Sequence, residues 1–238
     1  MMLAFDTATD RLTVALGTAG NIIAEINEDA PRAHLSRLLP AIDSLMKQAG
    51  IGLSAVDHIA VGIGPGSFTG LRIAVSTAQG LAHALDRPLI GVPTIDTVAA
   101  ALTGQSDTNI YPVLDAKRRE VYTAAYGRAG DRLTEYLVFD PKSLAKNLAA
   151  LDKPILMAGD GLAAYSSIFT AELGTNLKLA DPSLWPPRAS VLIELAEDKI
   201  DKGEVEPYLR VLPIYVRAPD AEESSRKILF GRSKGERG

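Results

Sequence analysis

One stretch, residues 59–93, contains a complete strand–helix–strand unit. A short apolar run at 59–62 leads through the turn Gly64-Pro-Gly66 into a helical segment at 67–85, and a second apolar run follows at 89–92. Two short apolar strands joined by a helix are typical of a parallel crossover unit. The chain is therefore predicted to contain a parallel β-sheet covered by helices.

The helix over 67–85 combines two side-chain patterns. Apolar residues recur at spacings of three and four, which predicts one continuous buried face. Small residues recur every four positions and leave a shallow groove that another helix can approach closely. We therefore expect this helix to be packed on more than one side. The apolar positions are Phe68, Leu71, Val75, Ala78, Ala82 and Leu85, and the small ones are Gly66, Gly70, Ala74, Ala78 and Ala82.

The order of expected elements around this unit occurs twice along the chain. The first half predicts strands at 2–7, 12–16, 21–26, 59–62 and 89–92 and helices at 34–49, 67–85 and about 95–102. The second half predicts strands at 109–115, 121–126, 132–138, 154–158 and 177–180 and helices at 143–151, 162–173 and 188–202. Two tandem βββαβαβα copies with mixed sheets describe the actin, sugar-kinase and Hsp70 architecture. The predicted fold class is thus α/β, of the actin-like ATPase (ribonuclease H-like) type, with a reduced second copy.

Length and composition agree with two compact domains in one globular chain. The chain has 238 residues, of which 47% are hydrophobic and 23% charged, and a polar linker at 103–108 separates the two copies. Domains are predicted at 1–103 and 104–217, followed by a basic, flexible tail at 218–238. The absence of cysteine excludes disulfides and thiolate metal sites, and no apolar run reaches the ~18 residues of a membrane span. A cytoplasmic location is expected.

Four segments together resemble the TsaB (YeaZ) family over almost the whole chain. The most specific is Gly64-Pro-Gly-Ser-Phe-Thr-Gly-Leu-Arg72. The other three are Leu3-Ala-Phe-Asp-Thr-Ala-Thr9, His34-Leu-Ser-Arg-Leu-Leu-Pro40 and Leu212-Pro-Ile-Tyr-Val-Arg217. The resemblance implies a non-catalytic member of the actin-like superfamily.

The same resemblance implies a role in tRNA modification. Such a chain would pair with the catalytic paralogue TsaD, joined by the ATPase TsaE, in a complex that forms threonylcarbamoyladenosine at A37 of ANN-decoding tRNAs. Without TsaD, the exposed apolar surface would pair with itself as a homodimer. The net charge of −4 indicates that contacts with tRNA are made mainly by the partner. The residues expected at the partner interface are His34, Leu35, Leu38, Leu39, Ile42, Leu45, Gly66, Ser67, Phe68, Gly70, Leu71, Arg72, Ala74, Val75 and Ala78.

A weak nucleotide site is expected where the first strand of each copy ends. Asp6 with Thr7, and Asp115 in the second copy, occupy equivalent places, and Gly159 and Gly161 form a glycine loop beyond them. In nucleotide-binding members of the superfamily such carboxylates position Mg²⁺ beside the phosphates of ATP or ADP. The alternative is that the carboxylates only cap turns. The rival function, a small-molecule kinase or ATPase, needs a phosphate-gripping loop, and no such loop is recognisable.

No metal site or catalytic residue is expected. His34, His58 and His83 lie on different elements and make no metal-ligating pair. Where TsaD carries two metal-binding histidines four residues apart, the resemblance places Thr94 and Val98, which cannot replace imidazole. Neither Ser36 nor Ser67 lies in a nucleophile motif. Ser67 is predicted to cap the long helix, and the glycines at 62–66 to serve a tight turn and close packing rather than phosphate binding.

Overall fold

The computed structural model describes residues 1–216 and contains two compact units. The first unit comprises Met1–Thr97 together with Pro186–Tyr215, and the second contains Val98–Trp185. The predicted boundary of the second domain, 104–217, is therefore wrong, since residues 186–215 return to the first unit. The predicted tail at 218–238 lies outside the described residues. Within residues 1–216, no helix is long and apolar enough to cross a membrane.

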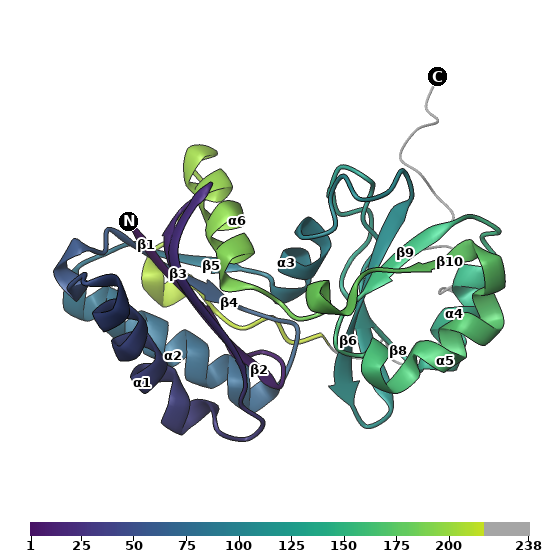
Figure 1. Ribbon diagram of the computed structural model, residues 1–238, viewed down its shortest axis with the longest axis horizontal. Helices are drawn as coiled ribbons and strands as arrows, with labels where there is room; N and C mark the ends of the chain where they lie inside the picture. Colours follow the sequence, from purple (N-terminus) through teal and green to yellow (C-terminus); the bar gives the residue numbers. More distant parts are fainter. Residues whose placement is uncertain (217–238) are drawn as a thin grey trace. The chain divides into compact units, whose positions relative to one another are not determined.

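The first unit is built on a five-stranded mixed sheet (Figure 1). The strand order is β3-β2-β1-β4-β5. β2 is antiparallel to its neighbours β1 and β3, whereas β1, β4 and β5 are parallel to one another. This is the order expected for the first copy. The strands are β1 (Met2–Asp6), β2 (Arg11–Thr18), β3 (Asn21–Asp29), β4 (His58–Gly62) and β5 (Leu89–Val92).

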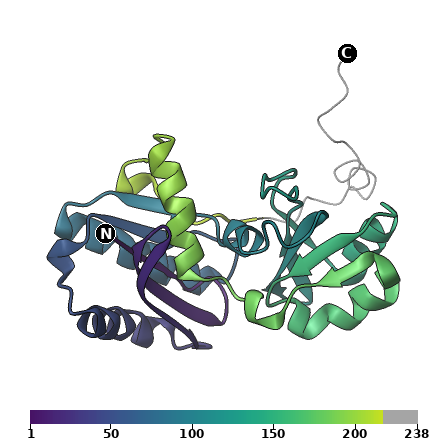
Figure 2. The same ribbon diagram turned by 45° about the horizontal axis from the view of Figure 1, so that its top comes forward.

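Three helices cover the two faces of this sheet. α1 (His34–Ala49) and α2 (Phe68–Leu85) lie side by side on one face, and α6 (Ala189–Asp201) crosses the other, as Figure 2 also shows. A hydrophobic core lies on each face of the sheet, because the side chains of successive residues along β1 point to opposite faces. Leu3 and Phe5 belong to the core beneath α1 and α2, whereas Met2 and Ala4 belong to the core beneath α6.

The place of α6 corrects the tandem-repeat expectation. The sequence predicts a helix at 188–202 as the end of the second copy, yet α6 packs on the first sheet. Polar contacts hold its beginning there: the Thr13 hydroxyl accepts a hydrogen bond from the Ala189 amide at 2.9 Å, and Glu25 pairs with Arg188 at 2.6 Å. An apolar helix face is not specific to one sheet, so its periodicity could not show which sheet it covers.

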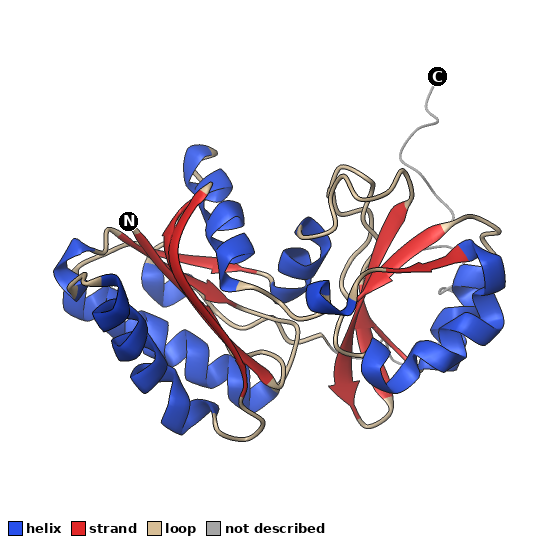
Figure 3. Cartoon of the chain, in the orientation of Figure 1, coloured by secondary structure: helices blue, strands red, loops and turns tan. Residues whose placement is uncertain are grey.

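The second unit carries its own five-stranded sheet, with α4 (Pro141–Ala149) and α5 (Leu162–Leu173) packed side by side (Figure 3). Its strand order, β10-β9-β6-β7-β8, corresponds to that of the first sheet. The strands are β6 (Asn109–Lys117), β7 (Glu120–Thr123), β8 (Leu137–Phe139), β9 (Ile155–Ala158) and β10 (Leu177–Leu179). The helix α3 (Thr94–Ala100) contains the boundary between the two units.

The third strand of the second copy is much shorter than predicted. A strand was expected at 132–138, but β8 is confined to Leu137–Phe139. Between β7 and β8 the chain makes only isolated bridges, from Tyr126 to Ile110 and to Arg132. A tight turn, in which the Gly127 amide donates a hydrogen bond to the Asp131 carbonyl at 2.8 Å, interrupts regular pairing. This shortening agrees with the prediction of a reduced second copy.

Short 3-10 turns complete the described chain. They are η1 (Leu53–Ala55), η2 (Gly174–Asn176), η3 (Pro182–Leu184) and η4 (Tyr208–Arg210). The last of these begins a segment that runs along α2, where the Gln79 side chain donates hydrogen bonds to the carbonyls of Tyr208 and Val211. Further on, the Ile214 amide donates to the Ile63 carbonyl at 2.8 Å. Sequence periodicity did not indicate this packing.

Candidate partner-binding site

Large apolar side chains remain exposed on α1 and α2. Leu35 is 79% exposed, Leu39 55% and Phe68 54%. Leu35 and Leu39 lie four positions apart, so they follow one another on the same side of α1. Exposed apolar residues gathered on neighbouring elements are typical of a surface that binds another protein. We call Leu35, Leu39 and Phe68 the apolar face.

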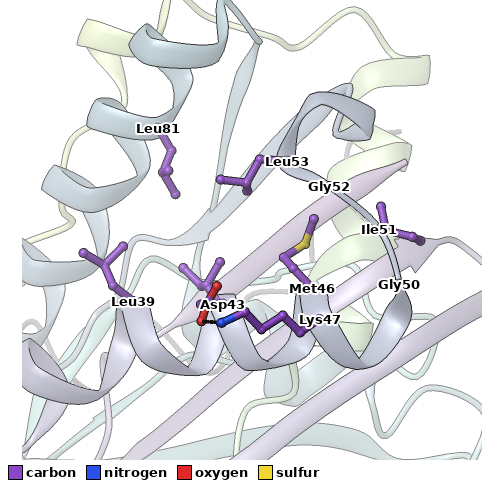
Figure 4. Close-up of a pocket in the computed structure, with 10 residues that line it drawn as sticks. Leu39, Asp43, Met46, Lys47, Gly50, Ile51, Gly52, Leu53 and Leu81 are labelled. Atoms are coloured by element: carbon purple, nitrogen blue, oxygen red, sulfur yellow. Dashed lines mark hydrogen bonds and ion pairs between the residues drawn. The ribbon is translucent and has the colours of Figure 1, made fainter.

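A groove continues from Leu39 along α1 (Figure 4). It has a volume of about 560 Å³ and includes Leu39 and Met46 of α1, Leu53 of η1 and Leu81 of α2. In Figure 4 the side chains of Leu53 and Leu81 extend toward the space above α1. The rim carries an exposed ion pair between Lys47 and Asp43, 2.7 Å apart. The groove therefore has an apolar floor and a polar edge.

Many residues expected at the interface are buried inside their own unit instead. Folding of the monomer already covers these side chains, so they support the surface from beneath, and of them only Ile42 lines the groove. The row of small residues on α2 packs against its own sheet and the neighbouring loop. Those buried are His34, Leu38, Ile42, Leu45, Gly70, Leu71, Ala74, Val75 and Ala78.

The small residues let α2 begin directly against the loop that follows β1. A Cβ atom on Gly66 would lie 2.4 Å from the Ala8 carbonyl oxygen, and one on Gly70 would lie 2.0 Å from that of Thr7. The Thr7 hydroxyl donates to the Gly70 carbonyl at 2.8 Å. The predicted structural role of these glycines is therefore confirmed. Ser67 is confirmed as the helix cap, since its hydroxyl accepts a hydrogen bond from the Gly70 amide.

An aromatic and cationic cluster borders the apolar face at the beginning of α2. The Arg72 guanidinium lies 4.0 Å from the centre of the Phe68 ring, and that ring lies 5.4 Å from the ring of Tyr215. Arg72 Nε is 3.4 Å from the Tyr215 hydroxyl. Tyr215 was not predicted as a site residue, although it belongs to one of the quoted segments. Its distance of 143 positions from Arg72 left no periodic signal to connect the two.

Asp6 is an internal cap. Its carboxylate accepts a hydrogen bond from the Ala8 amide and another from the Thr94 hydroxyl, both at 2.6 Å, and the residue is 1% exposed. A Cβ on Gly62 would lie 1.8 Å from Asp6 Oδ2, so the carboxylate fills the space that this glycine leaves. Burial raises the pKa of Asp6 to about 6, although the hydrogen bonds oppose the shift. Within its own unit, Asp6 therefore caps the turn after β1, as in the alternative interpretation of these carboxylates.

Asp115 also holds local structure in the second unit. One of its oxygens accepts a hydrogen bond from the Lys117 amide at 2.7 Å, and the other pairs with the Lys117 ammonium at 3.0 Å. Gly159 and Gly161 pack against β6, where a Cβ on either would come within 3 Å of Val113. Close approach to Val113 explains both glycines: its backbone at Gly159, and its side chain and carbonyl at Gly161. Thr7, the remaining residue of the expected nucleotide site, is buried against Gly70.

The histidines and the Thr94 position show no metal-binding arrangement. His34 is buried, its Nε2 lies 2.9 Å from the Thr9 carbonyl, and burial lowers its pKa. His83 Nδ1 lies 3.0 Å from the Tyr208 hydroxyl. Among residues 1–216 there is no group of three or more histidine, cysteine or acidic side chains that could hold a metal ion. Thr94 instead binds Asp6, and Val98 is buried.

Comparison with known proteins shows the family. The family model described as "TsaD: tRNA N6-adenosine threonylcarbamoyltransferase" matches residues 19–225. The tRNA threonylcarbamoyladenosine biosynthesis protein TsaB of Haemophilus influenzae is 35% identical, over 91% of this chain and 93% of that protein. The solved structure of YeaZ from Pseudomonas aeruginosa superposes with a TM-score of 0.75 at 34% identity, covering 90% of this chain and 99% of that one.

A more distant neighbour supports the fold alone. A ROK hexokinase from Thermus thermophilus has a TM-score of 0.52 at 12% identity, covering 84% of this chain and 99% of that one. The actin-like and sugar-kinase architecture expected from the element order is thus confirmed. Together with the full-length similarity above, it shows that the chain belongs to the TsaB family of tRNA threonylcarbamoyladenosine biosynthesis proteins, within the wider group that the TsaD model describes.

Proposed function

We propose that this chain is a non-catalytic subunit that binds the catalytic paralogue TsaD through the apolar face on α1 and α2. The observation that carries the proposal is the exposure of Leu35, Leu39 and Phe68 on these two helices of one unit. Arg72, stacked on Phe68, supplies a cation at the edge. Apolar anchors bordered by arginine are typical of the energetic centre of protein interfaces.

The groove beside Leu39 supports the same assignment. Its apolar floor would receive side chains of a partner helix, and the exposed pair of Asp43 and Lys47 would lie at the rim. In this proposal TsaD performs the transfer to A37, TsaE joins the pair, and the chain supports TsaD without reacting itself. When TsaD is absent, the same face would join two copies of this chain, because both states cover the same apolar residues.

Replacing Leu35 and Leu39 together by aspartate should abolish the pairing. Burial of one leucine contributes about 1.5–3 kcal/mol, and the substitution adds carboxylates that would have to be desolvated. We expect the affinity for the cognate TsaD to fall by more than about 100-fold, equivalent to roughly 3 kcal/mol. Complex mass measured by light scattering on the mixed proteins would report the loss.

Leu133→Asp is the matched control, because Leu133 is 51% exposed but lies outside α1 and α2. It should leave both the complex and any homodimer intact. Unchanged affinity of the double aspartate variant, with normal circular dichroism, would contradict the assignment of this face to TsaD.

The purified chain should not turn over ATP. The Asp6 carboxylate is enclosed by Gly62 and occupied by Ala8 and Thr94, so binding of Mg²⁺ at this carboxylate would require local rearrangement. Phosphate release from ATP and Mg²⁺ should stay at the rate of the buffer alone. A rate above background that disappears in Asp115→Asn would favour the kinase or ATPase alternative instead.

A further inference from the structure

The turn between β6 and β7 has an unusual backbone. Lys117, Arg118 and Arg119 all have positive φ angles, of 60°, 49° and 65°. Lys117 pairs with Glu120 across the hairpin, so Arg118 and Arg119 are the central residues of a two-residue turn. Positive φ at both central positions is typical of hairpin turns in which asparagine and glycine are preferred.

Arginine is a poor choice for such a turn. A side chain with a Cβ atom is disfavoured in the left-handed region, and two in succession add their costs. Elsewhere in residues 1–216, non-glycine residues at positive φ occur singly, at Arg32, Asp86 and Asp152, and other positive-φ positions, such as Gly20, Gly50 and Gly130, are glycines. Asparagine or glycine at these two positions would adopt the same backbone angles with less strain. Keeping arginine there indicates a function for the two side chains.

The two arginines are also available to bind a ligand. Both are exposed, and neither has a hydrogen-bond or ion-pair partner among residues 1–216. Lys117, next to them, already pairs with Asp115 at 3.0 Å. The hairpin thus presents two adjacent guanidinium groups at its tip, on a chain whose net charge is −4.

The surroundings of the tip favour phosphate over a protein partner. Within Val98–Trp185 the exposed large hydrophobic residues are Leu133 and Leu179, and neither belongs to β6 or β7, the strands that form the hairpin. The centre of a protein interface is usually depleted of charged residues, whereas contacts with a nucleic acid backbone are typically made by cationic side chains and need no apolar centre. The guanidinium group donates two parallel hydrogen bonds to phosphate oxygens.

We propose that Arg118 and Arg119 bind phosphate groups of the RNA backbone. The inference rests on the proposed function, in which the complex acts on tRNA, and adds a direct RNA contact made by this chain itself. The contact is independent of base sequence, because guanidinium groups bound to phosphates do not read bases.

Salt-dependent binding of an unmodified tRNA transcript tests the proposal. The probe is titrated with the full chain, alone and mixed with its cognate TsaD, over a series of salt concentrations. In the variant Arg118→Asn with Arg119→Gly, the slope of log affinity against log salt should fall by about 2, one for each lost phosphate contact. The same variant should have a higher melting temperature, because Asn-Gly suits the turn.

Two control variants make the result specific. Arg118→Lys with Arg119→Lys keeps both charges and should retain the slope. Lys142→Gln with Lys146→Gln removes the same charge from exposed positions on α4 and should also retain it. An equal fall of the slope in this second control would show a general charge effect and overturn the proposal.

Other outcomes also overturn the proposal. They are an unchanged slope in the folded Asn-Gly variant, the absence of RNA binding both with and without TsaD, and a loss of TsaD binding at an unchanged RNA slope. The last would assign the tip to a protein partner. Failure of the wild-type chain to bind TsaD would contradict the proposed function but not this inference, because the titration of the chain alone still decides it.

Discussion

Gly70→Ala should lower the free energy of unfolding by about 3 kcal/mol, the upper range for overpacking a close contact. A Cβ at this position would lie 2.0 Å from the Thr7 carbonyl oxygen, which is backbone and cannot rotate away. α2 would have to move away from the loop after β1 and stretch the hydrogen bond from the Thr7 hydroxyl to the Gly70 carbonyl. Urea unfolding followed by circular dichroism measures the change.

Gly80→Ala in the same helix is the control. A Cβ there meets no atom within 4 Å, so the higher helix propensity of alanine should stabilise the protein by roughly 0.5–1 kcal/mol. The two substitutions are chemically identical and should differ in sign. A stabilising Gly70→Ala would mean that the close approach of α2 to the β1 loop does not exist in solution.

Asp6→Asn should remove a pH dependence of stability between about pH 4 and pH 6. The pKa of Asp6 is about 6 in the folded protein against 3.8 for an ordinary aspartate. Because the folded-state value is the higher one, the contribution of this group is fully present below pH 3.8 and is lost as pH rises through 6. The difference of about two pKa units corresponds to about 3 kcal/mol. Burial causes the shift, so the effect belongs to the folded state.

The measurement is urea unfolding of both proteins from pH 4 to pH 7. Subtracting one curve from the other cancels the remaining titrating groups, and the asparagine variant should gain about 3 kcal/mol on the wild type across this range. Parallel curves would mean that Asp6 is solvated and open to ligands, which would restore the expectation of a nucleotide-binding carboxylate. Thr94→Val is a useful companion, since it removes the hydrogen bond at 2.6 Å and should raise the pKa of Asp6 further.

Local patterns were sufficient for most elements of the chain. The apolar runs at 59–62 and 89–92 became β4 and β5, and the cap at Ser67 begins α2 as expected. These strands and this cap depend on residues within a few positions of one another, so the local sequence pattern is sufficient to predict them. The strand predicted at 132–138 failed because tertiary pairing, interrupted by the turn at 127–131, decides how far a sheet edge extends.

The candidate site was predicted less completely than the fold. Leu35, Leu39 and Phe68 were expected at the interface and are exposed, but Ala74 and Ala78, expected beside them, are buried. A row of small residues indicates close packing without naming what packs there, and the partner proved to be the chain's own core. Tyr215 reaches Arg72 only through the folding of residues 208–215 along α2, which no period in the sequence describes.

The sequence alone determined the order of strands and helices, the turn chemistry around Gly64 and Ser67, and the resemblance to the TsaB family, since each resides in short contiguous motifs. Tertiary structure alone decided that α6 covers the first sheet and that Asp6 is enclosed by Gly62 and Thr94. The physical reason is that burial and pKa depend on atoms brought together from distant positions, whereas propensity and capping depend on near neighbours.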